Sequence, residues 1–261
     1  MSLKEKLKNQ LKPEELKFVP GAYDVVGDIA VVRVPETLET KSKLVAEAIM
    51  QVDKHVKTVL CQVSPVSGDF RLRDLEFVSG EEKTETVHRE FGCLFKIDLK
   101  DCYFSPRLSY ERMRIAGQVK PGETVVNMFA GVGCFSIIIA KRAKPRKVYS
   151  MDINPTAIRY HIENVRLNKV GDVVEPIEGD AEKIIEERLV GVTDRVLMPL
   201  PEKAYEYLEW ARLSLKPEGG WIHYYGFEHA DKTEDPIEKM KEKVTEKLLR
   251  LSSRFDIPFA R

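Results

Sequence analysis

Two glycines and two later carboxylates in the second half of the chain have the types and spacing to bind a nucleoside. The glycines are Gly131 and Gly133, in the stretch "NMFAGVGCFSIIIAK" between two hydrophobic runs. Asp152 follows about 20 residues later, the separation at which a carboxylate accepts hydrogen bonds from both hydroxyls of a ribose. Asp180 follows the next hydrophobic run. Since glycine lets the backbone approach a ligand closely, we expect these residues at one binding site.

The glycine turn alone permits three interpretations. The third glycine of a dinucleotide-binding fingerprint is missing, and Cys134 and Phe135 stand where a pyrophosphate needs the start of the helix clear of bulk. These features disfavour an NAD site and favour a ligand whose ribose carries no pyrophosphate. The NAD site and the site for a ligand without pyrophosphate are the first two interpretations. In the third, no ligand binds: the glycines only make a tight corner, and Asp152 caps the next helix.

Alternating strands and helices in this half of the chain place the turn and the two carboxylates at one edge of a sheet. Five buried strands separated by helices predict a parallel sheet covered on both faces, with ligands bound at the carboxyl ends of its strands. The expected strands are 123–130, 147–153, 173–181, 194–200 and 219–228, and the expected helices are 134–144, 155–170, 181–190, 202–215 and 235–252.

The first hundred residues follow a different pattern. One helix, 38–56, stands among stretches that resemble strands, which are 28–34, 58–63, 74–80 and 84–99. This pattern predicts an α+β part with mixed strand pairing. Pro106 marks the change, so we predict an N-terminal subdomain at 1–105 and a larger α/β domain at 106–261.

Composition narrows the class of protein without naming a partner. The 42 basic and 42 acidic residues balance, so net charge does not indicate nucleic acid. Cys61, Cys93, Cys102 and Cys134 form no CxxC pair, and we expect reduced thiols and no metal. The apolar runs are much shorter than the roughly 20 residues of a membrane helix, and the charged N-terminus is unlike a secretory signal. We expect a monomeric cytoplasmic protein.

The assembled motifs resemble those of the archaeal tRNA guanosine-37 methyltransferase family and of the neighbouring wybutosine-pathway aminocarboxypropyltransferases. The resemblance covers roughly residues 60 to 230 and rests on "YFSPRLSYERMR", "VVNMFAGVGCFSI", "MDINPTAI", "NVRLNKV" and "GGWIHYY". It implies a class I methyltransferase fold, S-adenosylmethionine (SAM) as the cofactor and tRNA as the partner. The reaction it implies is methyl transfer to N1 of guanosine 37 or to a wyosine intermediate.

The same resemblance assigns site residues. Glu111 matches the proposed general base, and Arg71 matches an arginine that supports catalysis. Asp152 is expected on the ribose and Asp180 near the adenine. The full set expected to bind the cofactor is Tyr103, Ser105, Arg107, Arg112, Phe129, Gly131, Gly133, Asp152, Ile153, Asp180, Ala181 and Pro199.

These residue types suit the implied chemistry. Guanine N1 carries a proton at neutral pH, so a carboxylate such as Glu111 must remove it as the nitrogen attacks the sulfonium methyl group. Negative charge then spreads towards O6, where the guanidinium of Arg71 can stabilise it. Basic residues at 71–73, 107–114 and 141–147 are expected to hold tRNA phosphates.

One departure keeps two other functions open. The methyltransferases of this family usually carry Asn-Leu-Pro after the fourth strand, where this chain has Pro199-Leu200-Pro201. Proline offers neither a side-chain amide nor a backbone N–H. The first alternative is therefore transfer of the 3-amino-3-carboxypropyl group of SAM, and the second is a non-catalytic protein that binds SAM and tRNA.

Overall fold

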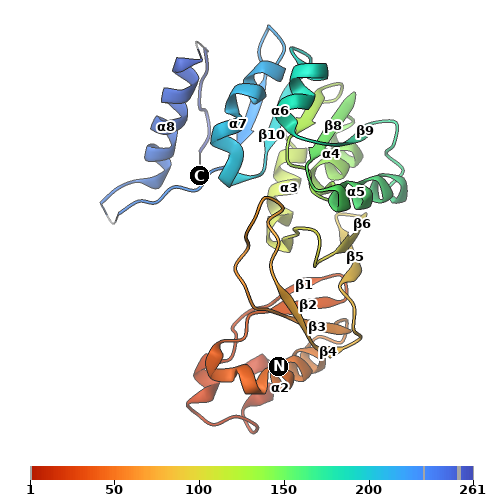
Figure 1. Ribbon diagram of the computed structural model, residues 1–261, viewed down its shortest axis with the longest axis vertical. Coiled ribbons are helices and arrows are strands. Elements are labelled where there is room, and N and C mark those ends of the chain that lie inside the picture. Colours follow the sequence, from red (N-terminus) through yellow and green to blue (C-terminus); the bar gives the residue numbers. More distant parts are fainter. Residues whose placement is uncertain (1, 232, 252–253, 261) are drawn as a thin grey trace.

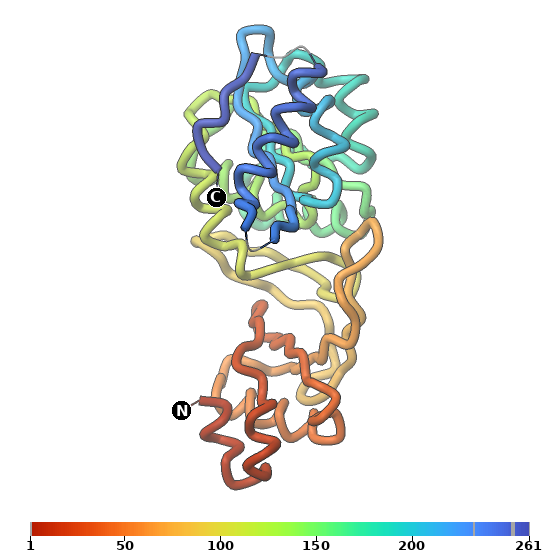
Figure 2. The backbone as a smooth tube through the Cα atoms, turned by 90° about the vertical axis from the view of Figure 1, so that its left-hand side faces the viewer, coloured from red at the N-terminus to blue at the C-terminus, as the bar shows by residue number. Residues whose placement is uncertain are grey.

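The computed structural model describes residues 2–231, 233–251 and 254–260. An N-terminal sheet lies at one end of the long axis and a parallel sheet at the other, with a hairpin between them (Figure 1, Figure 2). None of the described helices is long and apolar enough to cross a membrane.

The N-terminal sheet has the order β1-β2-β3-β4 and mixed pairing, since only β2 and β3 are parallel. The strand β1 was not predicted from the sequence. It pairs with β2, which is shorter than the strand expected at 28–34. Leu7, Leu38 and Ile49 are fully buried in the core of this part. Its elements are α1 (Leu3–Leu7), η1 (Glu15–Phe18), β1 (Asp24–Val26), β2 (Ile29–Val32), η2 (Glu36–Lys41), α2 (Ser42–Val52), β3 (Thr58–Gln62) and β4 (Leu75–Gly80).

The expected strand 84–99 is two strands, β5 (Glu85–Glu90) and β6 (Cys93–Asp98), paired as an antiparallel hairpin. Its turn is formed by Phe91 and Gly92, whose φ angles are 49° and 79°. Two positive φ angles are what a two-residue type I′ hairpin turn requires. Reading 84–99 as one strand was wrong because a phenylalanine occupies a turn position that asparagine or glycine usually fills.

The hairpin bridges the two parts of the molecule. On one side the Thr86 hydroxyl donates to the Asp28 carboxylate at 2.7 Å. A single hydrophobic cluster continues from Ile29 of β2 through Phe95 of β6 to Ile137 of the larger part. The boundary at residue 105 stays a prediction, and by its packing the hairpin belongs to both parts.

The larger part contains the parallel five-stranded sheet, in the order β11-β10-β7-β8-β9. The α/β fold class is thus confirmed. The strands are β7 (Thr124–Asn127), β8 (Lys147–Asp152), β9 (Val174–Glu178), β10 (Arg195–Met198) and β11 (Trp221–Tyr224). The helices are η3 (Pro106–Leu108), α3 (Ser109–Ala116), α4 (Cys134–Ala143), α5 (Pro155–Leu167), α6 (Ala181–Ile184), η4 (Ile185–Leu189), α7 (Pro201–Ser214) and α8 (Pro236–Arg250). The last residue expected in α8, Ser252, lies outside the described residues.

Helices cover both faces of this sheet. Val125 of β7 packs in the cluster that contains residues of α4 and α5, whereas its neighbour Val126 packs in the cluster of α6, α7 and α8. Because successive side chains of a strand point to opposite faces, the two clusters lie on opposite sides of the sheet. Because the helices cover both faces of the sheet, a ligand-binding site is expected at the carboxyl ends of its strands.

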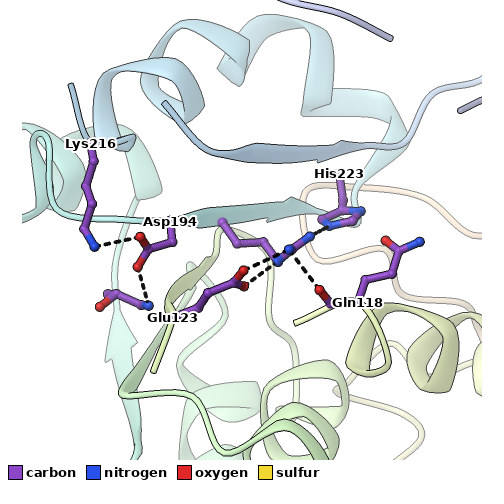
Figure 3. A network of polar contacts seen from close by, with 7 residues as sticks. Gln118, Glu123, Asp194, Lys216 and His223 are labelled. Carbon is purple, nitrogen blue, oxygen red and sulfur yellow. Dashed lines mark hydrogen bonds and ion pairs between the residues drawn. The ribbon is translucent and has the colours of Figure 1, made fainter. Parts of the chain in front are cut away.

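Buried Arg195 links β10 to β11 and to the segment between α3 and β7, and Figure 3 shows its partners Gln118, Glu123 and His223. Arg195 of β10 donates through Nε to Oε2 of Glu123 at 2.7 Å and through Nη2 to the Gln118 carbonyl at 2.9 Å. Its Nη1 lies 2.7 Å from Nε2 of His223, which must accept because arginine only donates. Burial, followed by the charge of Arg195, lowers the pKa of His223 to about 4.

Replacing Arg195 is expected to destabilise the fold strongly. Arg195→Met leaves the Glu123 carboxylate, whose side chain is 12% exposed, without its ion-pair partner, and we expect a loss of about 3–5 kcal/mol in the free energy of unfolding. The control is Arg188→Met, because Arg188 makes an exposed pair with Glu175 and should contribute less than about 1 kcal/mol. Equal midpoints of urea unfolding for the two variants would contradict this ranking.

Candidate active site

The glycine turn lies between β7 and α4, at the carboxyl edge of the parallel sheet. Gly131 has φ 53°, and no described atom lies within 4 Å of where its Cβ would be, so the turn leaves open space there. Gly133 has φ 92° and precedes α4, and a Cβ on it would come within 2.3 Å of the ring of His161. The first glycine thus leaves room for a ligand, whereas the second makes room for a buried side chain.

Asn164 of α5 and Asn168, the residue that caps the end of this helix, hold the hairpin, and Asn164 also holds the glycine turn. The Asn164 amide donates to the Val132 carbonyl of the turn at 3.0 Å and exchanges two hydrogen bonds with the Lys96 backbone of β6. Asn168 does the same with the Leu94 backbone. The two amides act as a neighbouring strand would, satisfying the backbone of the hairpin edge.

Asp152 ends β8 and faces the glycine turn. Its Oδ2 accepts from the Gly131 N–H at 2.6 Å and its Oδ1 accepts from the Asn154 N–H at 2.9 Å. Burial raises the pKa of this carboxyl, and the two backbone hydrogen bonds oppose that shift. Asn154, not Asp152, caps α5 by accepting from Thr156 and Ala157. Helix capping therefore does not explain the carboxylate.

A cavity opens at this edge of the sheet, with about 1020 Å³ of empty space when open solvent is included. The sequence-predicted residues that line it are Arg71, Tyr103, Arg112, Phe129, Gly131, Asp152, Ile153, Ala181 and Pro199.

The other predicted residues lie around the cavity rather than in its lining. Asp180 caps α6 and accepts from the Tyr207 hydroxyl at 2.8 Å. Ser105 accepts a hydrogen bond from Arg112 through its backbone carbonyl. Arg107 is exposed and pairs with Asp24 of β1 at 2.8 Å. Gly133, as described, packs against His161.

Glu111 lies on α3, outside the cavity lining. Its carboxylate accepts two hydrogen bonds from the Arg114 guanidinium, at 2.8 and 2.7 Å, and one from the Tyr225 hydroxyl at 2.7 Å. Burial, followed by this hydrogen bond, raises the pKa of Tyr225 well above its usual range. Glu111 is one residue from Arg112, which lines the cavity.

Arg71 reaches the cavity on a long loop between β3 and β4. The orange tube rises here from the lower to the upper part of the molecule (Figure 2). The Arg71 guanidinium lies over the ring of Tyr103, 4.5 Å from its centroid, and Nη2 is 3.1 Å from Oε1 of Glu202 at the start of α7. Its φ of 54° lies in the left-handed region, which is unusual for an arginine. The loop thereby closes one side of the cavity.

Sequence reasoning missed several lining residues. Lys203 and Tyr207 lie one helical turn apart on α7, just after Pro199 and Leu200. Their spacing, four residues apart and directly after a strand at the predicted edge, could have indicated them. Further residues of the lining that were not predicted are Asp69, Phe70, Phe104, Leu108, Met128, Ala130, Val132, Cys134, Phe135, Asn154, Ala157 and Leu200.

The basic stretch 141–147 lies away from the cavity. Helix α4 begins at the cavity with Cys134 and ends at Ala143, so this stretch is at the opposite end of the helix. There Arg142 donates to the Phe91 carbonyl in the hairpin turn at 2.7 Å. Within the described residues, no group of three or more histidine, cysteine, aspartate or glutamate side chains could hold a metal ion.

The buried ring of His161 is expected to make stability pH-dependent. Burial lowers its pKa from 6.5 to about 3. Below pH 6.5 the unfolded chain therefore binds a proton that the native protein rejects, and stability falls by up to about 1.4 kcal/mol per pH unit. We expect the His161→Leu variant to lose less stability than the wild type between pH 6.5 and pH 4, although His223 still contributes. Identical slopes in urea unfolding would contradict this.

Comparison with known proteins gives the family. Residues 86–252 match the family described as "TRM5/TYW2 methyltransferase domain", and residues 3–84 match the family described as "TYW2 N-terminal domain". The chain is 47% identical over 216 residues to the Pyrococcus abyssi tRNA (guanine(37)-N(1))-methyltransferase Trm5b, covering 82% of this chain and 63% of that protein. It is 40% identical to the Saccharolobus solfataricus tRNA 4-demethylwyosine(37)-methyltransferase Taw21, and the match covers 82% of this chain and 80% of that protein.

Other relatives carry out a different transfer. The Methanocaldococcus jannaschii tRNA(Phe) (4-demethylwyosine(37)-C(7)) aminocarboxypropyltransferase is 37% identical, over 84% of each chain. The crystal structure of Pyrococcus horikoshii TYW2 in complex with MeSAdo is 30% identical, with a TM-score of 0.76, over 96% of this chain and 86% of that one. With both halves matched by family descriptions, this chain belongs to the TRM5/TYW2 methyltransferase family.

Proposed function

We propose that this protein transfers a methyl group from SAM to N1 of guanosine 37, or to a wyosine intermediate, in tRNA. The observation that carries the proposal is the cavity, which joins the nucleoside-binding features of Gly131 and Asp152 to Arg71 and Pro199 on its other sides. The names of the Pyrococcus and Saccharolobus relatives support this activity and this partner. We propose that it acts in the cytoplasm as a monomer.

The residues present fit the cofactor. Gly131 leaves open space at the turn, and the Asp152 carboxylate stands beside it, able to accept the ribose hydroxyls. Phe129, Ile153 and Ala181 give apolar walls for the adenosine. SAM, when bound, supplies a sulfonium whose attached carbons are open to attack by a nucleophile.

The chain's own residues would move the proton and hold the charge. Glu111 would take the N1 proton of the guanine, for which it must release the Tyr225 hydroxyl or the Arg114 guanidinium. Arg71 would donate to O6, where negative charge develops, and Tyr103 would keep its guanidinium in place. Asp152 would hold the ribose, so that the base meets the transferred carbon in line.

Transfer of the aminocarboxypropyl group is the second candidate. Pro199 lines the cavity where the methyltransferases of the resemblance have asparagine. The match of residues 3–84 to the TYW2 N-terminal domain and the named Methanocaldococcus relative favour the same alternative.

The proposal is tested by asking where label enters tRNA. The protein is incubated with methyl-labelled SAM and either an unmodified tRNA transcript or a tRNA carrying the wyosine intermediate. The control transcript has adenosine in place of guanosine 37. We expect label in one of the first two RNAs and none in the control, and label in the control would exclude position 37.

A further inference from the structure

The long loop between β3 and β4 carries a tight turn at the cavity. Ser67 and Leu72 exchange two backbone hydrogen bonds, of 2.9 and 3.1 Å, which close this turn. Three residues at its tip, Asp69, Phe70 and Arg71, all line the cavity. Because backbone hydrogen bonds close the turn, the three side chains are held together at one side of the cavity.

Asp69 brings an available carboxylate to the cavity. It is exposed, and among the described residues its side chain has no hydrogen bond or ion pair. The other carboxylate of the described lining, Asp152, is held by two backbone N–H groups. Because an ionised carboxylate only accepts hydrogen bonds, Asp69 can bind a ligand that donates them.

Arg71 brings an unused donor to the same tip. Its Nη2 pairs with Glu202, whereas its buried Nε has no hydrogen-bond partner in the described part of the chain. Since almost every buried polar atom in a native structure has a partner, a ligand is expected to accept from this N–H. Phe70 stands between the two charged residues in the sequence and is 41% exposed. The tip therefore offers a ligand an acceptor, an aromatic ring and a donor.

These three groups match the pairing edge of guanine. N1–H and the 2-amino group of guanine donate hydrogen bonds, and O6 accepts them. Adenine, in contrast, has no 2-amino group and accepts at N1. A base taken out of its stack is recognised by hydrogen bonds to this edge and by stacking on aromatic side chains. Since Glu111 and Arg71 are proposed to act at N1 and O6, the 2-amino group is the donor that remains for Asp69.

We propose that Asp69 accepts a hydrogen bond from the 2-amino group of the target guanine while Phe70 stacks on its ring. The inference rests on the proposed transfer to guanosine 37 and narrows it. In the tricyclic wyosine intermediates this nitrogen is part of a third ring, so they offer no free amino group. A site that accepts from a substrate N–H discriminates against an analogue that lacks it, because the acceptor then has no partner.

Two tRNAs that differ by one amino group test the role of Asp69. One has guanosine at position 37, and the other has inosine, which keeps N1–H and O6 but lacks the 2-amino group. We expect Asp69→Ala to lower kcat/KM for methyl transfer at least about tenfold on the guanosine tRNA and less than about twofold on the inosine tRNA. Asp74→Ala is the matched control and should change neither value, because Asp74 is exposed on the same loop outside the lining.

The stacking contact is tested with Phe70→Leu. Since every base has an aromatic face, we expect this variant to lower kcat/KM several-fold on both tRNAs alike. Phe77→Leu is its control, because Phe77 is an exposed phenylalanine of β4 outside the lining. Wild-type values in Phe70→Leu would overturn the stacking contact.

Three further results separate this inference from the proposed function. An equal fall on both tRNAs in Asp69→Ala would overturn the contact with the 2-amino group, and so would a wild-type protein that uses both tRNAs equally well. Label only in tRNA that carries the wyosine intermediate would also overturn it, while the proposed function would stand. No label in any of these RNAs would instead contradict the proposed function itself.

Discussion

Asp152→Ala is expected to weaken binding of S-adenosylhomocysteine by at least about a hundredfold. The carboxylate would accept a hydrogen bond from each ribose hydroxyl, and hydrogen bonds to a charged group contribute about 1.5–3 kcal/mol each. The same carboxylate also holds the N–H groups of Gly131 and Asn154, so its loss loosens the turn as well.

Asp172→Ala is the control for this measurement. Asp172 is exposed in the turn before β9, at the amino edge of the same sheet. Its replacement should leave the affinity measured by calorimetry within twofold of the wild type. If Asp152→Ala bound as tightly as this control, the ribose assignment would be refuted.

Glu111→Gln is expected to lower the rate of group transfer by about 10²–10⁴-fold, while binding of S-adenosylhomocysteine changes less than twofold. Glutamine has nearly the same shape but cannot take the N1 proton. As the proposed base, Glu111 must release Tyr225 or Arg114 when tRNA binds, because both groups occupy its carboxylate.

The matched control for the base is Glu187→Gln, an exposed glutamate of η4. Single-turnover transfer to tRNA should be the same in this variant and the wild type. Full activity in Glu111→Gln would exclude Glu111 as the base. No transfer in the wild type, with cofactor and tRNA both bound, would favour the non-catalytic alternative.

The succession of strands and helices in the larger part and the location of the cavity edge were predictable because they follow from local patterns. The strand β8, for example, ends in Asp152, which lines the cavity. The hairpin was missed because side chains alternate between the two faces of the hairpin up to Phe91 and again after Gly92. Only the backbone conformation of the turn divides the two strands. The spacing of residue types along a sequence does not show whether a φ angle is positive or negative.

The rest of the site does not follow from local patterns, because long-range contacts build it. The role of Gly133 depends on His161, which comes from the next helix. The closed side of the cavity depends on Arg71 meeting Glu202, more than half the chain away. A sequence pattern finds residues at the ends of neighbouring strands, but not the loop that folds over them.

The identity of the transferred group is tested most directly by two labels on one cofactor. SAM carrying tritium in its methyl group and carbon-14 in its carboxyl group is incubated with the protein and the tRNA that accepts label, and nucleoside 37 is isolated. We expect tritium without carbon-14 in that nucleoside. Carbon-14 there would contradict methyl transfer and show that the aminocarboxypropyl group moves.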